Sequence, residues 1–189
     1  MGYRRGFKTE ATAIATEVRS ELGLGLFDPL DPYALADHLA IPILGLSVLA
    51  AEAPQIGHLL TVEPDVFSAV TVFAGTRRTI VHNDGHSRAR QNSNLCHELS
   101  HGLLQHPPTP ALDDRGCRIF NQGIEDEATW LAGCLLLTEQ AAMAIARGRW
   151  TRVDAAEHFG VSEAMIRFRI NKTGAAVRIE RATSRYARR

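Results

Sequence analysis

Helical spacing of apolar residues is the first pattern in the chain. In FKTEATAIATEVRSEL, residues 7–22, the apolar residues Ala13, Val18 and Leu22 stand among polar residues at helical spacing. Two glycines follow within three residues, and glycine inside a helix costs about 1 kcal/mol relative to alanine. A first helix is therefore expected over residues 7–22.

A short helix and three strands are expected next. Asp31 and Pro32 are typical of a helix start, because aspartate accepts hydrogen bonds from free backbone amides and proline fits the first helical position. The apolar run IPILGL then predicts a short strand. The β-prone run FSAVTVF, a turn at residues 74–76 and the run RRTIVHN predict a β-hairpin. Helices mixed with a small sheet indicate an α+β fold.

Longer helices are expected in the second half of the chain. One begins near His86 and runs to about Gln105, where two consecutive prolines end it. Residues 107–123 are rich in proline and glycine and predict an irregular loop, and a second long helix follows over residues 124–147. The run TRVDAAEHFGVSEAMIRFRI then predicts two short helices joined by a glycine turn.

The length of the chain, 189 residues, suffices for one substantial core with a small appendage. We expect a main domain over residues 1–150 and a small helical region with a basic tail over residues 151–189. The composition, 45% hydrophobic and 22% charged, is that of a globular protein and excludes a mostly disordered chain. Because the net charge is zero, the whole molecule has no strong field for nucleic acid or anionic membranes.

Cysteine usage and the N-terminal sequence bear on the cellular compartment. The three cysteines form no CxxC pair, which argues against a disulfide framework and favours a reducing compartment. Charged residues interrupt the start, MGYRRGFKTEATAIATEV, so no signal peptide is expected. No stretch approaches the roughly 20 apolar residues that a membrane helix needs. A cytoplasmic location is expected.

The stretch NLCHELSHGLL, in the first long helix, carries the candidate chemistry. His97 and His101 are four residues apart and share a helix face, so their imidazole nitrogens can converge on one point, which suits zinc. Glu98 lies about 100° further round the helix, where it can take a proton from a water molecule that the metal polarises. This HExxH pattern leaves a tetrahedral site short of one protein ligand, commonly a carboxylate from a second helix.

The second long helix offers Glu125 and Glu127 as the third ligand. From Glu125 the same helix face continues through Ala128 and Ala132, whose small side chains would let the two helices approach closely. From Glu127 the corresponding face is bulkier and would hold the backbones further apart. We therefore prefer Glu125 as the third ligand, and Glu127 stays the alternative.

The two segments RQNSNLCHELSHGLLQH and IEDEATWLAGCLLL resemble the signature of the ImmA/IrrE family of metallopeptidases. In that family an HELGH-type helix is followed by a helix reading approximately E-x-E-A-N-x-F-A-x-x-L-L, and the resemblance covers most of residues 8–145. It implies a minimal zincin-like domain with two active-site helices and a small sheet. It also implies zinc at His97, His101 and one glutamate of the ExE pair, with Glu98 as the catalytic residue.

The resemblance also suggests a substrate class. Family members are implicated in regulated cleavage of helix-turn-helix transcriptional repressors, which relieves repression. The resemblance thus implies a zinc-dependent endopeptidase whose partner is a DNA-binding repressor. An extended substrate segment could pair with an exposed strand, and the strand Arg77–Asn83 is a candidate.

Three positions depart from the family pattern: Cys96 stands where alanine is frequent, Ser100 where glycine is usual and Thr129 where asparagine is frequent. Thr129 lies four residues after Glu125, which suits a hydrogen bond to a ligand residue. Cys96 is interpreted as a small buried hydrophobe, with an oxidation-sensing or metal-competing thiol as the alternative. His106 lacks ligand spacing, so a place at the surface or behind a ligand is expected.

The C-terminal region admits two interpretations. Its helix pair resembles a helix-turn-helix that could place Arg167 and Arg169 in the major groove of DNA, helped by a tail in which residues 167–189 hold eight basic residues and one acidic residue. We favour instead a helical cap with Val161, Ile166 and Phe168 in its core, or a surface that docks the repressor. The alternative function is a metal-stabilised regulatory module that binds DNA or a repressor or antitoxin partner without proteolysis.

Overall fold

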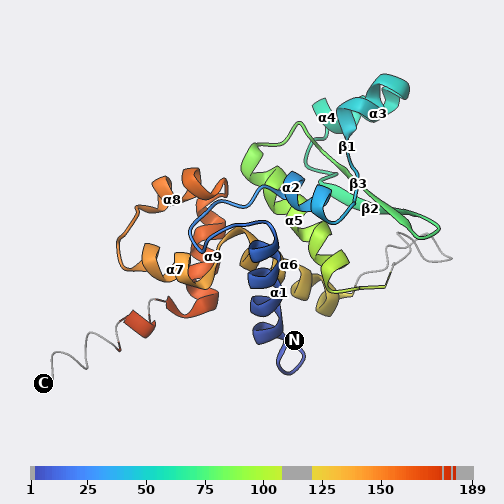
Figure 1. Ribbon diagram of the computed structural model, residues 1–189. Coiled ribbons are helices and arrows are strands. Elements are labelled where there is room, and N and C mark those ends of the chain that lie inside the picture. The colour runs from blue at the N-terminus through green and yellow to red at the C-terminus, as the bar shows by residue number, and fades with distance from the viewer. Residues whose placement is uncertain (1–2, 108–120, 176, 180, 182–189) are drawn as a thin grey trace, which may run out of the picture.

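The computed structural model describes residues 3–107, 121–175, 177–179 and 181 (Figure 1). Ten helices and a three-stranded sheet form this described part, so the predicted α+β fold is confirmed. No single helix within it has both the length and the apolar character that a membrane crossing needs. In chain order the elements are α1 (Phe7–Glu21), α2 (Pro32–His38), β1 (Ile43–Gly45), α3 (Leu46–Glu52), the 3-10 helix η1 (Pro54–Gly57), α4 (His58–Thr61), β2 (Ala69–Ala74), β3 (Arg77–His82), α5 (Arg88–Leu103), α6 (Gln122–Leu136), α7 (Glu139–Ala146), α8 (Arg152–Phe159) and α9 (Glu163–Thr173).

The first helix forms over nearly the predicted range, and of the three apolar residues that predicted it only Ala13 lies outside the buried face. Phe7, Ala11, Ala15 and Val18 are buried at helical spacing, and α1 packs against α6. Ala13 is exposed. The sequence pattern chose the wrong alanine because several alanines of this helix have equivalent apolar character, and only the packing against α6 distinguishes them.

The sheet has the strand order β1-β3-β2, with β3 parallel to β1 and antiparallel to β2. The predicted hairpin is therefore confirmed. Residues 80–82 of β3 pair with β1 on one side and with β2 on the other, so β3 is the central strand. The prediction that a substrate segment pairs with the strand Arg77–Asn83 is therefore wrong for these residues. The two edge strands are β1 and β2, and Val70 and Val72 of β2 are exposed.

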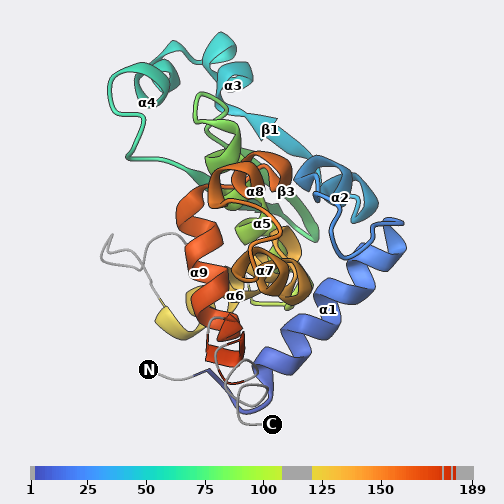
Figure 2. The same cartoon turned by 90° about the vertical axis from the view of Figure 1, so that its left-hand side faces the viewer.

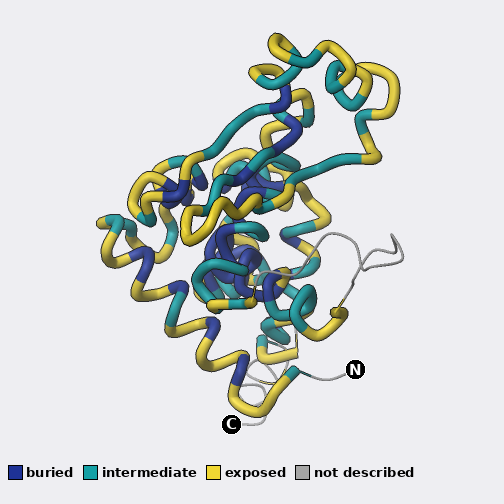
Figure 3. The backbone as a smooth tube through the Cα atoms, turned by 90° about the vertical axis from the view of Figure 1, so that its right-hand side faces the viewer, coloured by how far each residue is buried: buried dark blue, intermediate teal, exposed yellow. Residues whose placement is uncertain are grey.

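Helices α5 and α6 pack side by side, and α5 also packs against β2 and β3 (Figure 1). The buried segments of the chain gather at the centre of the molecule (Figure 3). Leu95 and Leu99 of α5 and Leu131 and Leu135 of α6 are fully buried. Burial of a leucine side chain contributes about 1.5–3 kcal/mol. The helices that carry the candidate ligands are thus held in place by fully buried leucine side chains.

The predicted helix over residues 124–147 is wrong in one respect, because it is divided into α6 and α7, whose axes differ by 68°. Leu137 has an extended backbone, and the Thr138 hydroxyl accepts a hydrogen bond from a backbone amide of α7, so a new helix starts there. The break leaves carbonyl groups without a helical hydrogen-bond donor, and two buried arginines donate to them. Arg169 donates to the Leu137 carbonyl, and Arg19 donates to a carbonyl in the last turn of α6.

The C-terminal helices α8 and α9 form the predicted pair, with Gly160 in the left-handed conformation between them (Figure 2). Phe159 and Ile166 belong to the same apolar core as α5 and α6, which supports the interpretation as a helical cap. Arg169 is buried, so only Arg167 of the two proposed base-reading arginines is exposed. DNA binding stays a prediction. Residues 182–189 of the tail and most of the expected loop 107–123 lie outside the described residues.

Candidate metal centre

The two central helices bring the three expected ligand residues together. Helix α5 presents His97 and His101, whose Nε2 atoms lie 3.1 Å apart. From α6, the Glu125 Oε2 atom lies 3.1 Å from His97 Nε2 and 3.7 Å from His101 Nε2. All three potential ligand atoms lie within 4.8 Å of one another, so a single ion could contact them together.

The first turn of α6 fixes the position of Glu125. The Asn121 side chain accepts hydrogen bonds from two backbone amides and starts the helix, and an acidic residue in the first turn is stabilised by the helix dipole. Ala128 and Ala132 are almost completely buried where α6 packs against α5. Small side chains on this face permit the close approach of the two helices that the sequence analysis expected.

Glu127, the alternative third ligand, faces different partners. The Arg4 Nε atom lies 3.1 Å from one of its carboxylate oxygens, and the His106 Nε2 atom lies 3.6 Å from the other. Among the residues that the structure describes, Glu127 is not part of the cluster that could hold an ion. The geometry therefore favours Glu125.

The protonation and accessibility of the cluster suit a metal. Burial, reinforced by the neighbouring His97, lowers the pKa of His101 to about 4, so its imidazole is neutral at pH 7. Imidazole nitrogens and a carboxylate oxygen are donors that zinc prefers. The side chains of His97, His101 and Glu125 are 25%, 22% and 34% exposed, which leaves the cluster open to solvent and to a substrate.

Both histidines also have a partner at the ring nitrogen that faces away from the cluster. The Thr129 Oγ1 atom lies 3.4 Å from His97 Nδ1, in agreement with the expected role of Thr129. The His106 Nδ1 atom lies 2.9 Å from His101 Nδ1. Such partners set the orientation of metal-binding imidazoles.

Glu98 lies beside the cluster and has a hydrogen-bond partner that was not predicted from the sequence. The Thr71 hydroxyl, from β2, donates a 2.6 Å hydrogen bond to Glu98 Oε2. Burial raises the pKa of the Glu98 carboxyl, while the bond from Thr71 and the neighbouring His97 act in the opposite direction. Strand alternation places Thr71 and the exposed Val70 on opposite faces, but it does not show which helix Thr71 contacts.

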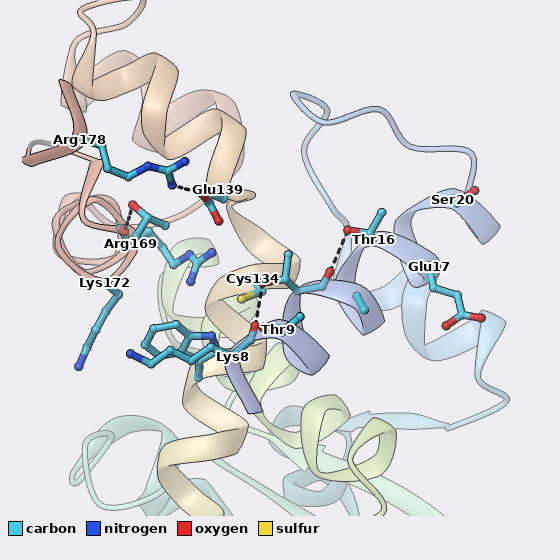
Figure 4. A pocket seen from close by; sticks show the side chains of 14 residues that line it. Lys8, Thr9, Thr16, Glu17, Ser20, Cys134, Glu139, Arg169, Lys172 and Arg178 are labelled. Carbon is cyan, nitrogen blue, oxygen red and sulfur yellow. Dashed lines mark hydrogen bonds and ion pairs between the residues drawn. The ribbon is translucent and has the colours of Figure 1, made fainter. Parts of the chain in front are cut away.

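The described cysteines are buried and free. Cys96 is completely buried, and Cys134 is 3% exposed at the wall of a groove of about 770 Å³ between α1 and α9 (Figure 4). Burial raises the pKa of both thiols, which lowers the thiolate fraction at neutral pH. The structure supports the interpretation of Cys96 as a buried hydrophobe. Cys117 lies outside the described residues.

We expect iodoacetamide to leave Cys96 and Cys134 unmodified in the native protein at pH 7.5 and to modify both in urea, because the reagent attacks an accessible thiolate. Peptide mass spectrometry after timed labelling distinguishes the individual cysteines. Rapid native labelling of Cys96 would instead support the sensing thiol.

A comparison with known proteins places this geometry in a family. The family model described as the IrrE N-terminal-like domain, a peptidase family, matches residues 53–171. The match includes α5 and α6, and with them every candidate site residue. No curated protein matches the chain. Because the matched segment spans well over half of the sequence, the chain belongs to the ImmA/IrrE family of metallopeptidases.

Proposed function

We propose that this protein is a zinc-dependent endopeptidase that hydrolyses another protein. The observation that carries the proposal is the convergence of His97, His101 and Glu125 from two packed helices, with Glu98 beside them. Family membership supports a peptidase that depends on a metal. The donor set and the neutral state of His101 support zinc as the ion.

In the proposed reaction, the residues of the site have different roles. Zinc, when bound by His97, His101 and Glu125, would supply Lewis acidity to the scissile carbonyl group and to the attacking water. Glu98 accepts a proton from that water and returns it to the leaving amine, and its raised pKa favours both steps near neutral pH. The Thr71 hydroxyl holds one oxygen of Glu98 in place during these transfers.

The position of Thr71 suggests where the substrate chain lies. β2 is one of the two edge strands of the described sheet, and it carries Thr71, the residue that contacts Glu98. A substrate segment that pairs with β2 in an extended conformation would pass beside Glu98. Main-chain hydrogen bonds to an edge strand bind such segments with little dependence on sequence.

We further propose that the substrate is a helix-turn-helix transcriptional repressor and that its cleavage relieves repression. The support is the resemblance of the two active-site helices to those of ImmA/IrrE proteins, together with membership of that family. Buried, unpaired Cys96 and Cys134 are compatible with work in the reducing cytoplasm, where such repressors act.

The proposal is tested by incubating the zinc-loaded protein with a lysate of its own cells and labelling newly formed protein N-termini. We expect a new N-terminus within a DNA-binding repressor, absent when a zinc chelator is added and restored by excess zinc. New N-termini found only in other proteins would contradict the proposal that the substrate is a DNA-binding repressor. Zinc-loaded protein that produces no new N-termini would overturn proteolysis and favour the regulatory binding module.

A further inference from the structure

The C-terminal end of α5 has a specific backbone arrangement. Gln105 has a φ of +53°, which is uncommon for a residue other than glycine. The Gln105 amide donates to the Gly102 carbonyl at 3.1 Å, and the His106 amide donates to the His101 carbonyl at 3.0 Å. This pair of bonds is the Schellman motif, in which the chain turns back over the last turn of the helix. In this motif, the residue that follows the left-handed residue lies next to the helix residue five positions earlier in the sequence.

In this protein those two residues are His106 and the candidate ligand His101. Their Nδ1 atoms lie 2.9 Å apart, and their ring centroids are 5.0 Å apart with the planes at 66°. The other nitrogen of His106, Nε2, lies 3.6 Å from Glu127 Oε2, and Arg4 holds the Glu127 carboxylate from the N-terminal segment. The His106 and Glu127 side chains are only 9% and 13% exposed, so water competes little for these contacts.

One arrangement of protons satisfies all of these contacts. His101 directs Nε2 toward His97 and Glu125, so a metal contact through that nitrogen requires the proton of His101 on Nδ1. This N–H donates to His106 Nδ1, which must then be the acceptor. The proton of His106 is consequently on Nε2, facing the carboxylate of Glu127, and a carboxylate only accepts.

We propose that His106 is a positioning residue that fixes the tautomer and the ring orientation of His101, with Glu127 and Arg4 holding His106 in turn. The inference rests on the proposed zinc site. It assigns a role to Glu127 that differs from that of Glu125: Glu125 contacts the ion, and Glu127 orients a ligand histidine through His106.

Zinc affinity tests the inference with three variants. His106→Leu removes the acceptor at similar volume, and His106→Asn keeps an acceptor oxygen near the place of Nδ1. The control, His38→Leu, removes an exposed histidine that pairs with Glu21 and belongs to neither the cluster nor the contacts of His106. Competition with a chromophoric chelator should show a dissociation constant about 10–100-fold higher for His106→Leu. His106→Asn should recover most of the affinity, and His38→Leu should match the wild type.

A spectroscopic readout separates orientation from a general loss of stability. In nitrogen NMR of the zinc-loaded wild type, we expect a proton on His101 Nδ1 that exchanges slowly with water. In His106→Leu this proton should exchange rapidly while the thermal unfolding midpoint of the metal-free protein stays close to that of the wild type. Wild-type affinity and slow exchange in His106→Leu would overturn the positioning role alone. A wild type that binds no zinc would overturn the proposed function as well.

Discussion

Replacing Glu98 with glutamine should slow cleavage by orders of magnitude while zinc stays bound. The amide has the size of the carboxylate and can still accept the hydrogen bond from Thr71, but it cannot take a proton at neutral pH. General acid–base catalysis by a positioned side chain contributes about 10²–10⁴-fold, so kcat should fall by that factor. Since Glu98 lies beside the ligand cluster and is not part of it, zinc binding does not need its charge.

The measurement combines the cleavage rate of the identified substrate with zinc analysis of the same preparations. Glu21→Gln is a matched control, because Glu21 is exposed and pairs with His38 far from the cluster in sequence. Its cleavage rate should equal that of the wild type. If Glu98→Gln cleaves at the wild-type rate, Glu98 is not the proton acceptor; if it loses zinc, Glu98 supports the metal site itself.

Replacing Glu125 with alanine should remove zinc from the purified protein, whereas Glu127→Ala should retain it. A site with three protein ligands binds about one zinc per chain. Loss of the only carboxylate in the cluster leaves two histidines, which is too few for a stable tetrahedral site. Glu127→Ala keeps all three residues of the cluster and removes the contacts of Glu127 with His106 and Arg4.

Elemental analysis after gel filtration decides between the two glutamates. His101→Ala should lose zinc as Glu125→Ala does, which provides a positive control for a missing ligand. Circular dichroism establishes that each variant is folded before its zinc content is compared. Zinc retained in Glu125→Ala and lost in Glu127→Ala would reverse the assignment of the third ligand.

The parts of the site that follow from local geometry could be predicted from the sequence. His97 and His101 share a face because any helix places residues four apart side by side. The choice of Glu125 needed only the small residues Ala128 and Ala132 on the same face. Thr71 could not be found in this way, because its contact with Glu98 depends on how β2 packs across α5, which the alternation of a strand does not specify.

A place for His106 behind a ligand was one of the two expectations, but the helix break after α6 and the backbone motif that positions His106 were not predicted, for different reasons. The break between α6 and α7 had a local signal in Thr138, a good helix cap, but the donors at the break, Arg19 and Arg169, come from distant parts of the sequence. His106 lies at the spacing of a Schellman motif from His101. That motif was not recognisable because its left-handed position holds Gln105, where glycine is the usual signal.

The position of Glu125 on α6 ties the proposed metal site to the folded state. Glu125 is 28 residues from His97 in the sequence, so the cluster exists only when α6 has packed against α5. A ligand that binds only the folded chain stabilises it by about 4 kcal/mol at a thousandfold excess over its dissociation constant. Under the proposed zinc-dependent function, the protein would unfold more often in a zinc-starved cell and be degraded faster. Zinc supply would then control the abundance of this protein as well as its chemistry.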